Sequence, residues 1–185
     1  MKQKKGKSMN KRKFIFWTVV FLSALNFSSP VYAGKKEDAK KQIEVLNQKM
    51  KEAGEKGDLQ AAIDAAEQAL EIASEHFGKE SAETAKTMTN AANLYMYAHH
   101  AEDAERFYKN VILIESKIYS ENDLNLADSF YSLAMAYAVQ KKYPEARKML
   151  DKAFKIRAKR LGENHPDTQK IRETIDKIWS EGVSS

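Results

Sequence analysis

Residues 127–168 read ADSFYSLAMAYAVQKKYPEARKMLDKAFKIRAKRLGENHPDT, and this stretch decides the fold. Apolar residues recur in it at the spacing of an amphipathic helix, first over residues 130–137 and again over residues 143–154. The polar residues 140–142 between them mark a turn. Pro144 suits the first turn of the second helix, because the N–H that proline lacks would be unbonded there. The stretch therefore predicts two helices joined by a short turn.

The same pattern occurs twice more upstream, at a fixed offset of 42 residues and without a gap. The matched positions are Ala62, Ala104 and Ala146; Ala69, Val111 and Ala153; Ile72, Ile114 and Ile156; Phe77, Tyr119 and Leu161. Such self-similarity is the signature of a repeat architecture. It predicts repeats at 43–84, 85–126 and 127–168, followed by a capping helix at 167–181 with its apolar face on Ile171, Ile175, Ile178 and Trp179.

Glycines fall where these helices should end. Gly57 can close the first helix of repeat 1 in the left-handed conformation, and Asp58 can cap the next helix. Gly78 and Gly162 follow the second helices of repeats 1 and 3. No glycine is left over for a phosphate-binding loop.

Several segments resemble the tetratricopeptide repeat, and more narrowly the 42-residue version found in kinesin light chains. TNAANLY at 89–95 and YSLAMAY at 131–137 resemble the signature of its first helix, helix A. YPEAR at 143–147 and LGENHPD at 161–167 resemble its turns within and between repeats. The resemblance covers about residues 39–168. It implies an all-α solenoid of three helix-turn-helix repeats plus the capping helix, with a concave groove that binds another polypeptide.

The resemblance also implies which side chains line that groove, because helix A contributes them. The residues at the family's groove positions are Lys51, Lys86, Asn90, Asn93, Tyr97, Tyr131 and Met135. Asparagine amides can pair with a peptide backbone, while Met and Tyr accept varied apolar side chains. Members that clamp a C-terminal carboxylate need basic residues where this chain has Asn47 and Asp128, which argues against a clamp of that kind.

Residues 1–33 have the form of a signal peptide. A basic segment through Lys13 precedes an apolar run from Phe14, and Val31-x-Ala33 suits signal peptidase, so the exported chain should begin at Gly34. The alternative is an uncleaved membrane anchor over residues 14–33, but polar residues and a proline interrupt that stretch. Translation from Met9 would leave a sufficient basic segment.

Net charge, cysteine content and the one histidine pair limit the partners and the kinds of site that we expect of this chain. The net charge of +5 comes from the leader, because seven of the 31 basic residues and none of the 26 acidic ones precede Gly34. Nucleic acid is therefore not an expected partner. Cysteine is absent, so stability must come from packing.

The pair His99-His100 lacks the i, i+4 spacing that directs two imidazoles at one metal ion, and we interpret it as a solvated turn.

The mature chain carries an uneven charge distribution. Residues 52–105 hold twelve acidic and three basic residues, whereas residues 141–160 hold nine basic and two acidic ones. Solvated helix faces explain each run. The functional alternative is a basic ridge at 141–160 that steers an acidic partner, or head-to-tail association of copies.

These observations predict an exported scaffold, periplasmic or secreted, that binds a peptide or helix of another polypeptide in its groove. We expect no catalysis, no cofactor and no metal, and membrane contact only through the transient signal peptide. The alternative is a structural subunit that forms homo-oligomers through its end helices and has no separate ligand.

The leader generates the first prediction. Protein recovered from the export compartment should begin at Gly34, because signal peptidase accepts the small residues before it. Intact-mass spectrometry measures this directly. A species that keeps residues 14–33 and partitions with membranes would show an anchor instead.

Overall fold

The computed structural model describes residues 30–183, and every regular element in that range is an α-helix. The helices are α2 (Pro30–Glu55), α3 (Leu59–Phe77), α4 (Ala82–Tyr97), α5 (Ala101–Ile118), α6 (Leu124–Val139), α7 (Tyr143–Leu161) and α8 (Pro166–Val183). This confirms the predicted all-α repeat solenoid. The predicted capping helix is α8. The chain divides into two units, Met1–Asp38 and Ala39–Ser185, and the predicted signal peptide lies outside the described residues except for its last four.

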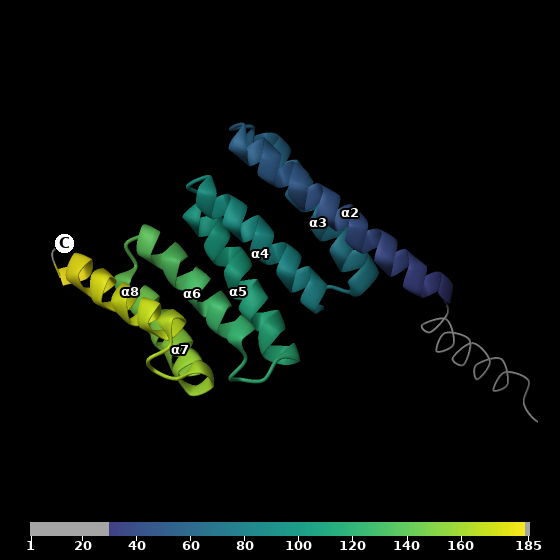
Figure 1. The fold of residues 1–185 in the computed structure, drawn as a ribbon. Coiled ribbons are helices and arrows are strands. Elements are labelled where there is room, and N and C mark those ends of the chain that lie inside the picture. The colour runs from purple at the N-terminus through teal and green to yellow at the C-terminus, as the bar shows by residue number, and fades with distance from the viewer. Residues whose placement is uncertain (1–29, 184–185) are drawn as a thin grey trace, which may run out of the picture. The chain divides into compact units, whose positions relative to one another are not determined.

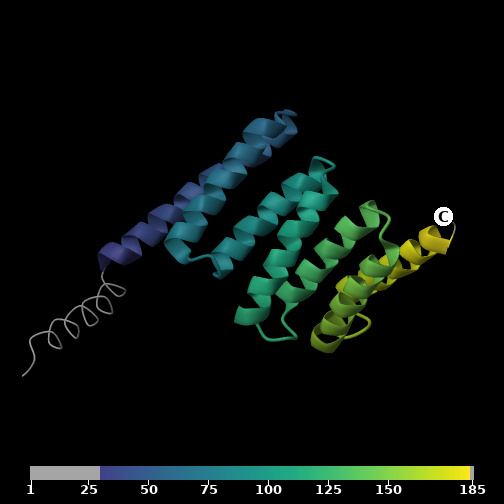
Figure 2. The same ribbon diagram turned by 180° about the vertical axis from the view of Figure 1, so that it is seen from behind.

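Within the second unit, consecutive helices pack against one another in chain order from α3 to α8 (Figures 1 and 2). The pair α2 and α3 is joined by a separate apolar cluster in which Ile43 and Leu46 meet Ala65 and Ala69. The largest cluster joins α4 to α8 and includes Tyr108, Leu150 and Ile171. Stability therefore depends on contacts between neighbouring helices, as expected for a repeat architecture.

One buried position in each repeat is occupied by alanine. Ala62, Ala104 and Ala146, which share one position in the three repeats, have no solvent-exposed surface. A methyl group at this position lets the two backbones come close together, and a larger side chain would force them apart. The position predicted from the 42-residue offset is thus a core position in all three repeats.

The turns within the three repeats share a left-handed residue. Gly57, His99 and Lys141 stand 42 residues apart and have φ angles of 78°, 62° and 59°. The sequence predicted this conformation for Gly57 but gave no sign of it for the other two, whose side chains make it costly. After the first of these turns, Asp58 caps α3 as predicted by accepting a hydrogen bond from the Ala61 amide at 3.1 Å.

A buried carboxylate joins repeat 2 to repeat 3. Glu105 on α5, with only 12% of its side chain exposed, accepts hydrogen bonds from Lys109 at 2.5 Å and from Lys142 at 2.9 Å. Gln140, at the end of α6, donates a third bond at 2.9 Å. Burial by itself would raise the pKa of Glu105, but these three bonds outweigh it and lower the pKa to about 2.

The glycine turn generates the second prediction, which uses a matched pair of substitutions. Gly57→Ala should lower the free energy of unfolding by about 1 kcal/mol, because alanine resists the left-handed conformation. An added Cβ there would meet no atom within 4 Å, so only backbone strain changes. Gly54→Ala, inside α2, should instead stabilise by about 0.5 to 1 kcal/mol, because alanine favours the helix. Its Cβ would make an ordinary contact with Leu94 at 3.9 Å. Urea unfolding of both variants tests this, and equal effects would refute the left-handed turn.

The third prediction concerns acid stability. Because the folded-state pKa of Glu105 lies below its ordinary value of 4.5, the ion-pair network stabilises the protein above pH 4.5 and loses this effect as pH falls through about 2. Glu105→Gln should therefore cost about 2 to 3 kcal/mol at pH 7 and progressively less below pH 4. Urea unfolding of both proteins at several pH values measures the difference. A cost that stays constant over this range would mean that the charge of Glu105 is not the stabilising feature.

Candidate functional site

Two adjoining cavities lie along α2, α4 and α6. The larger, of about 580 Å³, is lined by these three helices and by Glu115 and Tyr119 near the end of α5. We call these two residues its base, because Glu115 is only 8% exposed. The smaller, of about 440 Å³, lies between α2 and α4. Asn47 and Asn90 line both cavities, which makes them parts of one groove. We call the two parts the large cavity and the small cavity.

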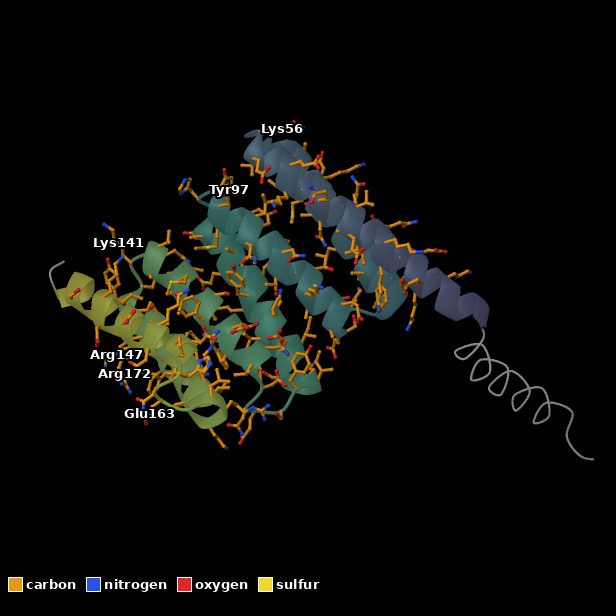
Figure 3. All side chains as sticks on the ribbon, in the orientation of Figure 1. Lys56, Tyr97, Lys141, Arg147, Glu163 and Arg172 are labelled. Atoms are coloured by element: carbon orange, nitrogen blue, oxygen red, sulfur yellow. The ribbon has the colours of Figure 1, made fainter. Side chains whose placement is uncertain are left out.

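Five of the seven predicted groove residues line these cavities. Lys51, Asn90, Asn93 and Tyr97 line the small cavity, and Lys86 joins Asn90 in the large one. Tyr97 is 68% exposed and lies at the C-terminal end of α4, next to the turn that leads into α5 (Figure 3). Successive positions on one face of α4 therefore point into the groove, as the helical spacing predicted.

Tyr131 and Met135 are placed differently. Both are partly buried and pack against the apolar cluster that joins α4 to α8, and neither lines the large or the small cavity. The α6 residues in the large cavity are instead Asn125, Asp128, Ser129 and Ser132. Two of them could have been predicted from the repeat, because Asp128 and Ser132 lie 42 residues after the predicted groove residues Lys86 and Asn90.

A buried tyrosine fixes one groove amide. Tyr108 on α5 is 2% exposed, and its hydroxyl donates a hydrogen bond to Asn93 Oδ1 at 2.5 Å. Burial raises the pKa of Tyr108 to about 12 although the Ser132 hydroxyl counteracts it, so the phenol stays protonated and keeps donating. This bond fixes the orientation of the Asn93 amide, and its Nδ2 is available to donate to a ligand.

The base of the large cavity is acidic. Glu115 is 8% exposed, and its Oε2 accepts a hydrogen bond from the Ser129 hydroxyl at 2.6 Å. Burial raises the pKa of Glu115 and outweighs this bond, and the negative charges of Asp123 and Asp128 raise it further. The pKa of Tyr119 is also raised, first by burial and then by Glu115 and other nearby carboxylates. The sequence did not single out Glu115, because the resemblance assigned the groove to helix A residues alone.

Ion pairs at the rim of the groove are exposed and weak. Lys40 lies 3.9 Å from Glu83, and Lys51 lies 3.9 Å from Glu55. Exposed pairs at this distance contribute little to stability, so a charged ligand can displace them readily. Lys86, also at the rim, forms no ion pair with any described residue.

The histidine pair lies in the turn between α4 and α5. His100 Nδ1 is 3.7 Å from Asp103 Oδ2, and His99 adopts the left-handed conformation described above. Among the described residues, no group of three or more His, Asp or Glu side chains is arranged to hold a metal ion. None of the helices in residues 30–183 combines the length and the apolar character that a membrane span needs.

Comparisons with known proteins agree with this architecture. Residues 126–167 match the family model described as the tetratricopeptide repeat. The fold is similar to a crystal structure of the kinesin light chain TPR-like repeats of Podosopora anserina, with 20% identity and a TM-score of 0.67, over 77% of this chain and 68% of that one. It is also similar to BtubC (BKLC) from P. vanneervenii, with 20% identity and a TM-score of 0.65, over 75% of this chain and 55% of that one.

At these identities the likeness to the solved structures establishes the fold. No curated protein matches the chain.

Proposed function

We propose that this chain, a tetratricopeptide-repeat protein, is a scaffold that binds a segment of another polypeptide in the groove along α2, α4 and α6. The repeat fold by itself indicates a protein-interaction scaffold. The observation that carries the finer proposal is the continuity of the groove, because Asn47 and Asn90 line both of its cavities. A ligand can therefore run across the paired helices instead of occupying a single closed pocket.

The chemistry of the lining suits a peptide. Asn90 offers donor and acceptor groups, and Asn93 offers an amide donor held in place by Tyr108. Such groups can pair with the carbonyl and N–H groups of an extended backbone. The exposed ring of Tyr97 supplies apolar surface for its side chains. Cavities of about 440 and 580 Å³ have the size of ligand pockets in proteins.

The proposal involves no chemical reaction and no cofactor, since the repeat fold belongs to non-catalytic scaffolds. It places the protein outside the cytoplasm, in the periplasm or secreted, and what supports this is the leader at residues 1–33. The partner is accordingly an envelope or secreted polypeptide.

Crosslinking from chosen positions tests the groove and generates the fourth prediction. A photo-crosslinking amino acid at Lys86 or Tyr97, in the native compartment, should give an adduct with one and the same partner. The same amino acid at Lys148 or Lys159 on α7, both exposed and outside the lining of either cavity, should not. Asn93→Ala should then weaken binding of that partner by about 1 kcal/mol, roughly fivefold, because it removes the positioned donor.

Lys159→Glu is the matched control for binding. Arg157 would be a poor one, because it pairs with Asp128 and donates to the Asp167 carbonyl at 3.2 Å. If the α7 positions crosslink and Lys159→Glu abolishes binding while Asn93→Ala does not, the basic ridge is the working surface. Adducts with the mass of two copies of this chain would support the self-assembling subunit.

A further inference from the structure

We propose that the polypeptide bound in the groove places an arginine or lysine side chain in the large cavity, against the carboxylate of Glu115 and beside Tyr119. This inference rests on the proposed function and adds the chemistry of the partner to it. Four observations carry it: the missing counter-ion of Glu115, the residues at the same position of the other repeats, the charges around the cavity, and the depth of Glu115 within it.

Glu115 is a buried carboxylate without a cationic partner. It is 8% exposed, and among the described residues its side chain has one hydrogen bond, from Ser129 to Oε2. No lysine, arginine or histidine in residues 34–178 lies within ion-pair distance of it. The residue lines a cavity large enough for a ligand. Burying an ionised carboxylate in this way is unfavourable unless a positively charged group pairs with it.

The repeat fold does not require an acid at this position. The 42-residue offset takes Glu115 to Ala73 in repeat 1 and to Arg157 in repeat 3. Ala73 is fully buried in an apolar cluster, so a small apolar residue satisfies the packing there. Arg157 pairs with Asp128, so a charge at this position in repeat 3 has its counter-ion. Glu115 alone of the three carries a charge that the described residues leave uncompensated.

The surroundings of Glu115 favour a cation. Burial is the main cause of the raised pKa of Glu115, and the nearby acids Asp123 and Asp128 raise it further. Burial also raises the pKa of Tyr119, followed by Glu115, Asp123 and Glu83. Arg157 compensates Asp128, and Lys40 compensates Glu83 through a long, exposed ion pair. Glu44 and Lys86 line the same cavity with opposite charges, so one negative charge remains in excess. Tyr119 adds an aromatic ring at the same base, and aromatic rings attract cationic groups.

The depth of the site indicates a long side chain. Glu115 and Tyr119 belong to α5 and its C-terminal end, whereas the cavity walls come from α2, α4 and α6. A backbone lying along the asparagines of the walls must therefore extend a side chain down to the base. Arginine and lysine combine this length with positive charge, and arginine can also bond a carboxylate and stack on a ring at once.

A library of random short peptides displayed on phage, selected on the purified protein, tests this inference. Selected peptides should share an arginine or lysine at one fixed position. Selection on Glu115→Gln, which keeps the shape and the bond to Ser129 but removes the charge, should lose that preference. With one selected peptide, replacing its basic residue by citrulline or glutamine should weaken binding at least fivefold. The same replacement should have less than a twofold effect on Glu115→Gln, because the two groups interact directly.

The possible outcomes distinguish a failure of this inference from a failure of the proposed function. Peptides that bind, lose affinity with Asn93→Ala and share no basic residue would overturn this inference and leave the groove intact as the binding site. A basic residue whose effect is unchanged by Glu115→Gln would also overturn it. If no peptide binds, or if binding is insensitive to Asn93→Ala, the proposed function fails as well. Urea unfolding shows whether Glu115→Gln is folded, and we expect it to be more stable than the parent at pH 7, since the ionised carboxylate is unfavourable where it is buried.

Discussion

Close packing at three alanines is the constraint on which the rest of the molecule depends. Ala62, Ala104 and Ala146 are fully buried at the same position of each repeat. Because a closely packed interior leaves no room for a larger side chain at this position, the helices of every repeat can pack in the same way. That regularity lets the next helix pair stack in a similar way. It also brings Asn47 of α2 and Asn90 of α4 to the wall of one shared groove.

Two glutamates on α5 show how the same side chain can serve packing or binding. Glu105 is surrounded by Lys109, Lys142 and Gln140, and its charge joins two repeats. The corresponding residue of repeat 1 is Ile63, which packs in an apolar cluster. At this one position, repeat 1 therefore contacts its neighbour through apolar packing and repeat 2 through ion pairs. Glu115, ten residues further along, has a hydroxyl partner and no counter-ion among the described residues. Charge compensation, more than burial, separates the structural acid from the candidate binding acid.

Much of this fold could be predicted from the sequence, because a 42-residue period records which helix face is buried. The period placed the alanine core, and the local chemistry of Gly57 and Asp58 placed the turn between the first two helices. It could not show that His99 and Lys141 adopt the same backbone conformation as Gly57, since their side chains argue against it. For the groove, helical phase identified the α4 residues. It did not show that Tyr131 packs against the core, or that α5 forms the base of the groove, because a period gives the direction of a side chain but not its depth.

The stacking of helices only on their neighbours also bears on how such a chain changes over evolutionary time. Most packing contacts join helices that are consecutive in the chain, and equivalent positions recur every 42 residues. A tandem duplication of one such segment in the gene would insert a helix pair whose two ends match the surfaces already present. The groove would gain a further wall helix, and the segment of partner that it accommodates would lengthen in proportion. The length of ligand that the groove contacts can thus change by one repeat at a time, while the side chains that hold the existing repeats together stay the same.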